Sequence, residues 1–269
     1  MTQFFDSHAH YFDARFASEE CPRGVDTLLD SLFDACDLAG IVNVGTDIPS
    51  SYAAIAQAKR YPLMYAAAGI HPSDAQRYPA MEAELAKLEV LLQSARENKI
   101  VALGEIGLDY HYQETDKKVQ AEYLDAQLAL AVRYHMPVII HDREAHGDCL
   151  DAVCRHPGVF GVFHSYSGSA EMAQELIRHG FYISFSGTIT FKNATKIAAV
   201  AASLPRDRVL IETDCPYLAP HPFRGQLNHS GLMKYTAIKL GELWGVECEE
   251  AAKITLKNAK RLFCLGKEI

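Results

Sequence analysis

The sequence predicts a (β/α)8 barrel, the α/β TIM barrel fold, as a single domain. Eight short runs of apolar, β-branched or aromatic residues have the character of strands, and segments of helical period lie between them. Five of these runs reach a His, Glu or Asp and then enter a polar loop. A doubly wound open sheet is the structural alternative, but chemically active residues after so many separate strands favour a barrel, whose strand ends all face one mouth.

We take the elements in chain order. Strands are expected near residues 3–7, 41–45, 64–69, 100–104, 137–140, 159–163, 181–185 and 208–212. Apolar residues at intervals of three and four predict helices, for example over 25–38, 81–96, 117–134 and 170–178, with a final pair near 231–243 and 248–263. A Pro- and Gly-rich loop after the last strand is expected to lie across the barrel mouth. We expect one domain over 1–269, with the C-terminal helices of 231–263 included.

The overall composition is that of an ordinary globular protein. The chain has 269 residues, of which 49% are hydrophobic and 22% charged. Its formal charge of -8 argues against broad adhesion to nucleic acid or to an anionic membrane, because both depend on Lys and Arg. The charge does not exclude phosphate chemistry, since a divalent metal pair supplies positive charge locally.

The cysteines and the first residues predict the compartment. The seven cysteines include no C-x-x-C pair, and the chain begins without the pattern of a secretory signal. No stretch has the apolar length needed to span a bilayer. We therefore expect a soluble protein of the reducing cytoplasm, with no membrane association and no obligate protein partner.

Six groups of metal-ligand type follow predicted strands. His8 and His10 are two residues apart, so both imidazoles point to one face of a strand. Bringing all six groups to one mouth without a cation would carry desolvation penalties of several kcal/mol. Imidazoles mixed with carboxylates suit zinc, manganese or iron, whereas magnesium prefers more oxygen, so the ion stays open. The predicted ligands are His8, His10, Glu105, His141, His164 and Asp214.

The central position of Glu105 predicts a site for two metal ions with this carboxylate shared between them. Asp214 would then bind one ion and take the proton of a metal-activated water, so Asp214 and Glu105 are the predicted catalytic groups. Hydrolysis is the expected reaction class.

Six motifs recur in order along the chain, at 6–10, 69–72, 104–110, 137–141, 163–168 and 211–217. Together they resemble the TatD-related metal-dependent deoxyribonucleases of the amidohydrolase superfamily. The resemblance covers nearly the whole chain and implies a TIM barrel, divalent metals (Mg, Mn or Zn) and hydrolysis of phosphodiester bonds in DNA. It implies that His8 and His10 bind the first metal and that Glu105 bridges. It further implies that His141 and His164 bind the second metal and that Asp214 is ligand and base.

Three residues are candidates for binding a substrate phosphate. The resemblance places His71 near the phosphate, with a hydrogen-bonded loop histidine as the alternative. Arg143 shares the orientation of His141 if the strand continues, although a salt bridge to Glu144 or Asp142 is equally compatible. Arg224 on the loop after the last strand is the third candidate, and its alternative is a solvated surface position.

Tyr110 and Tyr112 can stack on a base or simply pack at the rim.

The chain departs from the family pattern after Arg224. In the family, an Asn after this Arg commonly precedes x-Pro, whereas in this chain the Asn is followed by His229 and Ser230. This departure bears on how the rim grips the substrate.

Single-stranded DNA or DNA ends are the expected substrate. The alternatives are another ester or amide, such as an aminoacyl ester on RNA, a lactone or a cyclic amide. Glu105 disfavours a cyclic amide as the substrate. Some relatives have a modified lysine as the bridge between the metal ions at this place, whereas this chain has a glutamate. A noncatalytic metal-binding scaffold is the third hypothesis, and the presence of all six ligands argues against it.

Overall fold

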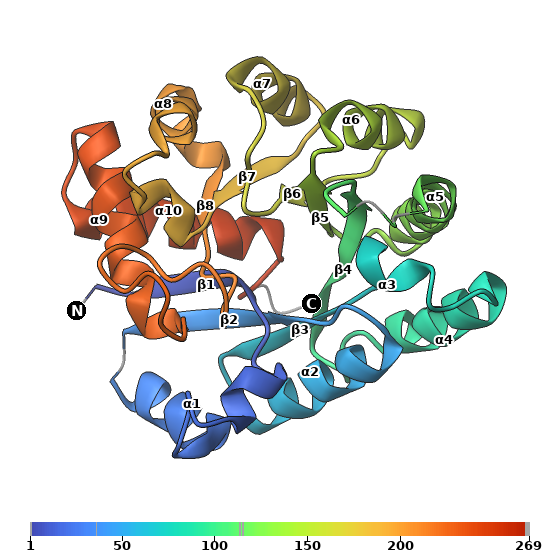
Figure 1. Cartoon of the computed structure of the whole chain (residues 1–269), viewed down its shortest axis with the longest axis horizontal. Helices are drawn as coiled ribbons and strands as arrows, with labels where there is room; N and C mark the ends of the chain where they lie inside the picture. Colours follow the sequence, from blue (N-terminus) through green and yellow to red (C-terminus); the bar gives the residue numbers. More distant parts are fainter. Residues whose placement is uncertain (1, 36, 113, 115, 267–269) are drawn as a thin grey trace.

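The chain folds into a (β/α)8 barrel (Figure 1). The computed structural model describes residues 2–35, 37–112, 114 and 116–266. Within these residues, eight parallel strands form one sheet in the order β1 to β8, each hydrogen-bonded to the next along the chain. The strands are β1 (Phe4–Ala9), β2 (Leu38–Val44), β3 (Met64–Ala68), β4 (Ile100–Asp109), β5 (Val138–Arg143), β6 (Gly161–Phe163), β7 (Tyr182–Phe185) and β8 (Val209–Ile211).

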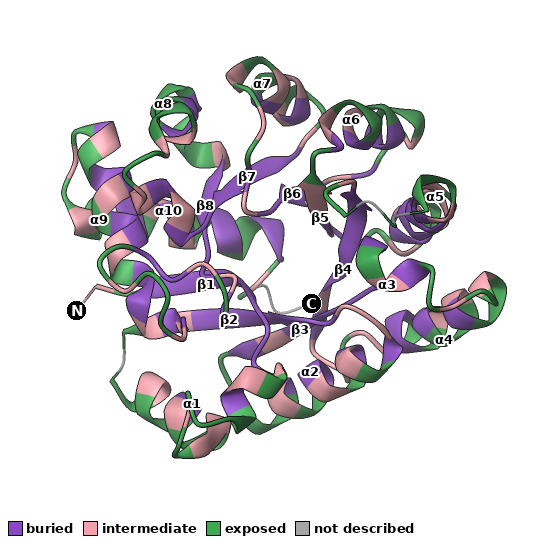
Figure 2. Ribbon diagram, in the orientation of Figure 1, coloured by how far each residue is buried: buried purple, intermediate pink, exposed green. Residues whose placement is uncertain are grey.

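Helices surround the strands on the outside of the barrel (Figure 1). The α-helices are α1 (Gly24–Asp34), α2 (Ile48–Arg60), α3 (Pro72–Ala75), α4 (Met81–Gln93), α5 (Lys117–Tyr134), α6 (His146–Arg155), α7 (Ala170–Arg178), α8 (Thr195–Ser203), α9 (Met233–Trp244) and α10 (Cys248–Leu262). Short 3-10 helices are η1 (Ala14–Ala17), η2 (Gly187–Thr190), η3 (Arg206–Arg208) and η4 (Ser230–Leu232). Each apolar helix face packs on the strands, so the strands are buried almost throughout (Figure 2).

The sheet nearly closes between its first and last strands. Ala9 and Cys215 form an isolated parallel bridge beyond the end of β8. The backbone N–H of Asp214 donates to the carbonyl of His8 at 2.9 Å, and the N–H of His10 donates to the carbonyl of Cys215 at 2.8 Å. Segments more than 200 residues apart are thereby held side by side.

A layer of apolar side chains, one or two from every strand, fills one end of the barrel. Ile139, Val162 and Leu210 belong to this layer, and α10 contributes Ala259 and Leu262 to it. A titratable residue stands two positions after each of these three strand residues, namely His141, His164 and Glu212, and side chains two positions apart in a strand share a face. The barrel interior is therefore apolar on the side of α10 and polar at the opposite mouth.

The structure confirms the barrel and all eight strands, and it corrects several boundaries. The helix predicted over 25–38 ends at Asp34, because Leu38 already begins β2 and pairs with Phe4. The helix predicted over 81–96 ends at Gln93, where Ser94 leaves helical geometry. The extent of the domain, 1–269, stays a prediction.

The prediction that His8, Glu105 and His141 follow their strands was wrong, because β1, β4 and β5 continue past these residues. Parallel pairing joins Gly107 to His141 and Asp109 to Arg143. Gly107 has φ 148°, and a Cβ there would collide with the backbone carbonyl of His141. A glycine lets the two strands approach closely enough to extend their ladder to the mouth.

No helix in the described part of the chain is both long enough and apolar enough to cross a membrane.

Candidate metal centre

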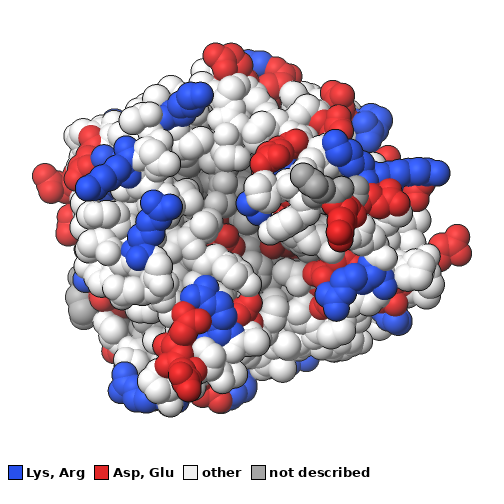
Figure 3. All heavy atoms as spheres, viewed as in Figure 1, with Lys and Arg blue, Asp and Glu red and all other residues white. Residues whose placement is uncertain are grey.

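A cavity of about 740 Å³ lies at the mouth of the barrel, formed by the ends of the strands and the loops after them. Figure 3 shows the hollow in the middle of this face, with Lys and Arg in separate groups around it rather than along a track. Among the predicted site residues, the cavity is lined by His10, His71, Glu105, His141, Arg143, His164 and Asp214. His8 lies below them and is fully buried.

Glu105 on β4 is the centre of the cluster. Its Oε2 lies 3.3 Å from Nε2 of His8 and 3.6 Å from Nε2 of His10. Its Oε1 lies 2.9 Å from Nδ1 of His141 and 2.8 Å from Nε2 of His164. The two carboxylate oxygens thus face two different pairs of imidazoles.

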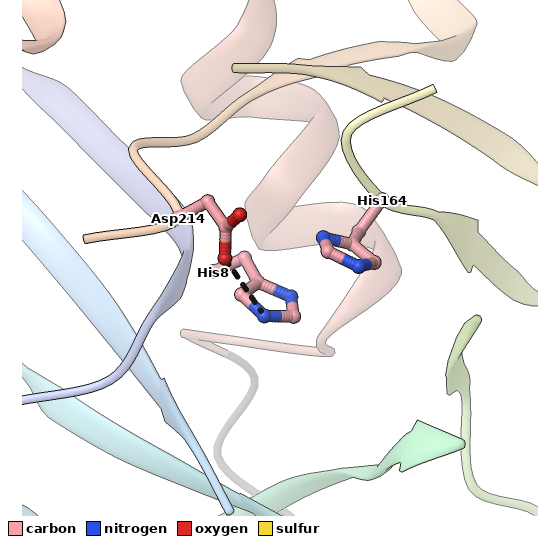
Figure 4. A group of neighbouring side chains, drawn as sticks. All are labelled: His8, His164 and Asp214. Carbon is pink, nitrogen blue, oxygen red and sulfur yellow. Dashed lines mark ion pairs between the residues drawn. The ribbon is translucent and has the colours of Figure 1, made fainter. Parts of the chain in front are cut away.

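Asp214 approaches the same cluster from the segment after β8. Its Oδ1 lies 3.4 Å from Nε2 of His10 and 3.7 Å from Nε2 of His8. Figure 4 shows the carboxylate directed at His8, with His164 alongside. The rings of His8 and His164 stack, with centroids 4.0 Å apart. Asp214 has φ 56°, in the left-handed region that few non-glycine residues adopt and in which Asp is enriched.

The donor atoms fit a metal ion. Nε2 of His8 and Nε2 of His10 lie only 2.9 Å apart, and both face carboxylate oxygens in a buried setting. A cation accepts all of these lone pairs at once, which no single proton can do. Among the described residues, three groups have donor atoms close enough to hold an ion: His8 with His10 and Glu105, His8 with His164 and Asp214, and His71 with Glu105 and His141.

The imidazoles determine the charge of Glu105. Burial alone would raise the pKa of this carboxyl, but His164, His71 and His8 hold the pKa well below its usual range. Burial also opposes ionisation of Asp214, yet a hydrogen bond from His10 and the nearby imidazoles lower the pKa of Asp214. Both carboxylates are therefore charged at neutral pH and available as ligands.

The candidate ligand histidines differ in the group that contacts the second ring nitrogen, the one that does not face Glu105. Nδ1 of His10 lies 2.7 Å from the carbonyl oxygen of Val44. His141 and His164 instead face the carboxylates of Asp109 and Glu212, two residues that sequence reasoning did not single out. Both stand within the quoted motifs, and Glu212 is two positions before Asp214, so the period of a strand could have indicated it.

His71 is both a loop histidine and a member of the cluster. Its Nδ1 accepts a hydrogen bond from the N–H of Ser73 at 3.1 Å, which caps α3. Its Nε2 lies 3.5 Å from Oε1 of Glu105 and faces the cavity. Burial lowers the pKa of His71, so the ring is neutral at neutral pH.

Arg143 lines the cavity because β5 continues to this residue, as the prediction for a continuing strand required. Its guanidinium lies 5.5 Å from the centre of the Tyr112 ring. The two acids considered as its partners contact histidines instead: Glu144 lies 2.7 Å from His111 and Asp142 lies 2.8 Å from His146.

Arg224 lies apart from the other two phosphate-binding candidates. Its guanidinium is 4.6 Å from the centre of the Phe191 ring, and it is not among the described residues that line the cavity. The loop that carries it does reach the mouth through Tyr217 and Leu218. The Asn before His229 is Asn228, which is buried and donates to the carbonyls of Thr213 and Tyr217, so this loop is anchored to the strand end.

Comparison with known proteins agrees with this geometry. The family model described as TatD related DNase matches residues 5–264. The chain belongs to the TatD-related DNase family. It is 42% identical to the uncharacterized metal-dependent hydrolase YabD of Bacillus subtilis (strain 168), over 96% of this chain and 98% of that protein. This TatD family member is therefore a metal-dependent hydrolase with His, Glu and Asp clusters for the metal.

Two further relatives match along nearly the whole length. The uncharacterized metal-dependent hydrolase TatD of Mycobacterium tuberculosis (strain ATCC 25618 / H37Rv) is 35% identical over 97% of this chain and 98% of its own. The crystal structure of YjjV, a TatD homologue from Escherichia coli K12, superposes with a TM-score of 0.87 at 32% identity, covering 97% of this chain and 98% of that one. The TatD family assignment thus applies to the complete barrel.

Proposed function

We propose that this TatD family protein is a deoxyribonuclease that hydrolyses phosphodiester bonds of DNA, at single strands or ends, through a metal-activated water. The observation that carries the proposal is the buried carboxylate of Glu105 between two pairs of imidazoles at the floor of an open cavity. The name of the family supports DNA as the substrate.

The residues divide between two metal ions. His8 and His10 would hold the first ion, His141 and His164 the second, and Glu105 would face both. Bound divalent ions (Mg, Mn or Zn) supply Lewis acidity for a phosphoryl oxygen and lower the pKa of water.

The remaining groups serve the substrate. Asp214 is charged and next to His10, so it can accept the proton of the attacking water. Arg143 presents a forked donor to a phosphate oxygen from the end of β5, and the neutral ring of His71 can offer one hydrogen bond. We keep Arg224 as a candidate for binding a phosphate farther along the DNA strand.

The size and charge of the mouth support single strands or ends over a long duplex. A cavity of about 740 Å³ has the volume of a small-molecule site, and the net charge of -8 disfavours a long electrostatic contact. Tyr112 lines the cavity with 57% of its surface exposed, which suits stacking on an unpaired base. We propose the cytoplasm as the location, where the cysteines, free at every described position, would stay reduced.

The test is release of labelled nucleotides from single-stranded DNA with magnesium, manganese, zinc or chelator. Asp214→Asn keeps the side-chain volume but removes the proton acceptor, so we expect the rate to fall roughly 10²- to 10⁴-fold. Asp142→Asn is a matched control, since Asp142 lines the same cavity but pairs with His146. An aminoacyl-RNA ester and a lactone are assayed in parallel. If metal-loaded protein left DNA intact and turned over either compound, the DNA assignment would be wrong.

A further inference from the structure

We propose that Glu212 and Asp109 are positioning residues that fix the imidazoles of His164 and His141 for the second metal ion. Each carboxylate would hold one ring nitrogen of its histidine so that the other nitrogen presents its lone pair beside Glu105. The inference rests on the metal centre of the proposed function, and it assigns roles to two residues outside the predicted ligand set.

Glu212 lies behind His164, away from the cavity. Its side chain is completely buried, and its Oε1 accepts a hydrogen bond from the N–H of Ser165 at 2.8 Å. The same oxygen lies 3.2 Å from Nδ1 of His164. On the other side of the ring, Nε2 of His164 is 2.8 Å from Oε1 of Glu105. A proton on Nδ1, donated to Glu212, leaves Nε2 free to bind a cation.

Asp109 serves His141 in the same way but through the other ring nitrogen. Its Oδ2 lies 3.1 Å from Nε2 of His141, whose Nδ1 faces Oε1 of Glu105 at 2.9 Å. Asp109 is itself held: its Oδ1 accepts the N–H of His111 at 3.0 Å, and its backbone exchanges two hydrogen bonds with Gln120. His141 is thereby assigned as an Nδ1 ligand and His164 as an Nε2 ligand.

The imidazoles on the two sides of Glu105 differ in the groups that contact their far ring nitrogens. Nδ1 of His10 faces a neutral carbonyl, that of Val44. Nδ1 of His8 is buried and has no hydrogen-bond partner among the described residues. By contrast, a carboxylate stands behind His141 and another behind His164, the two imidazoles that lie 2.9 Å and 2.8 Å from Oε1 of Glu105. Because a carboxylate partner orients a ligand imidazole and raises its basicity, its loss typically weakens metal binding 10- to 100-fold.

The test measures binding of Mn²⁺ alone and Zn²⁺ alone to the metal-free full chain by calorimetry, with bound metal counted by elemental analysis. Glu212→Gln and Asp109→Asn keep the side-chain volume and remove the charge. For each variant we expect the affinity of one ion equivalent to fall 10- to 100-fold. Asp142→Asn is the matched control: its neighbour in sequence is His141, but its carboxylate pairs with His146, and we expect unchanged affinity.

Two further readouts separate positioning from simple damage to the fold. The circular dichroism spectra of the metal-free variants should match that of the metal-free wild type, which shows that both variants fold. Absorption of the Co²⁺-loaded protein should change in both variants, because it reports the geometry of the ligands. The proposal would be overturned if Glu212→Gln and Asp109→Asn bound two equivalents of Mn²⁺ and of Zn²⁺ with dissociation constants within about threefold of wild type.

The outcome for DNA is independent of this result. Wild-type protein that binds metal but cleaves no DNA overturns the proposed function and leaves the roles of Glu212 and Asp109 to be decided by the binding data. Wild-type protein that binds neither ion overturns the metal centre and this inference together.

Discussion

Glu105 and Asp214 are carboxylates in a place where charge is normally avoided, and the reason they remain charged is local. Each is surrounded by imidazoles that favour its ionised form more than burial disfavours it. Each carboxylate directs an oxygen at the same two imidazoles, those of His8 and His10. Removing one of these imidazoles therefore leaves a buried charge with less compensation, which is destabilising in a dry interior.

Arg143 and Arg224 allow a direct comparison of two predicted phosphate contacts. We expect Arg143→Met to lower kcat/KM for a single-stranded oligonucleotide roughly 10- to 100-fold, the usual loss for a hydrogen bond to a charged group. Arg224→Met should have a smaller effect, because Arg224 lies over Phe191 outside the lining of the cavity. Steady-state kinetics of both variants decide the matter, and equal losses would contradict the ranking.

β4 and β5 are the elements on which the site depends most, since they carry Glu105, Asp109, His141 and Arg143. Their pairing beyond Glu105 places these side chains in a common register at the mouth. Strands that ended at residues 104 and 140, as the apolar runs alone indicate, would leave Asp109 and Arg143 on loops. The extended ladder gives them fixed backbones instead.

Gly107 makes that extended pairing possible, so its substitution should be costly. We expect Gly107→Ala to lower the free energy of unfolding by more than about 2 kcal/mol, because it combines an unfavourable φ with a collision against the His141 carbonyl. Urea unfolding measures the change. Gly147→Ala is the control, since a Cβ there meets nothing within 4 Å, and a similar loss in both variants would contradict this account.

The start of α2 predicts a pH effect. Asp47 caps the helix by accepting the N–H of Ser50, and it also accepts the hydroxyl of Tyr78 at 2.7 Å. Burial would raise the pKa of Asp47, but hydrogen bonds from the Ser50 hydroxyl, the Ser50 N–H and the Tyr78 hydroxyl hold this pKa below its ordinary value of 3.8. Because the folded pKa is depressed, the stabilisation is present above about pH 4 and is lost as the pH falls below that value.

Asp47→Ala should therefore lower the free energy of unfolding by about 1 kcal/mol at neutral pH. The difference from wild type should shrink as the pH falls from 5 toward 2. Denaturant unfolding across this range measures both curves. A difference that stays constant with pH would show that the charge of Asp47 contributes nothing.

The whole molecule brings its first and last strands together at the metal centre, so ligand binding and folding are coupled. His8 and Asp214 join opposite ends of the barrel sequence, and their backbones hydrogen-bond to each other at the point of near closure. An ion bound between them would link the two edges of the sheet. We therefore expect bound metal to stabilise the native barrel over the unfolded chain, in which no such site exists.

Chelation should have a measurable effect on stability. At a free ion concentration 100 times the dissociation constant, binding stabilises the fold by about 2.7 kcal/mol. For a protein of this size, we expect chelator to lower Tm by roughly 5 to 10 °C and to abolish hydrolysis. Thermal unfolding with and without chelator tests this, with re-addition of Mn²⁺ as the control. An unchanged Tm would contradict the coupling.

Two kinds of signal in the amino-acid order were sufficient for the fold and for the six ligand candidates. Alternating apolar runs indicate strands because side chains in a strand repeat every second residue, and parallel strands in a barrel bring their ends to one mouth. His8, His10, Glu105, His141, His164 and Asp214 could be grouped on this basis alone. The structure brings their side chains within contact of one another.

The length of β4 and β5, the ring nitrogen that His141 and His164 each direct at Glu105, and the histidines that Asp109 and Glu212 contact could be recognised only in the folded chain. Each depends on a contact between residues distant in sequence, such as the pairing of Gly107 with His141 or the approach of Glu212 to His164. Periodicity reports which face a side chain occupies, because that is a local property of the backbone. Which atom a side chain meets there depends on packing between strands, and that is decided when the barrel closes.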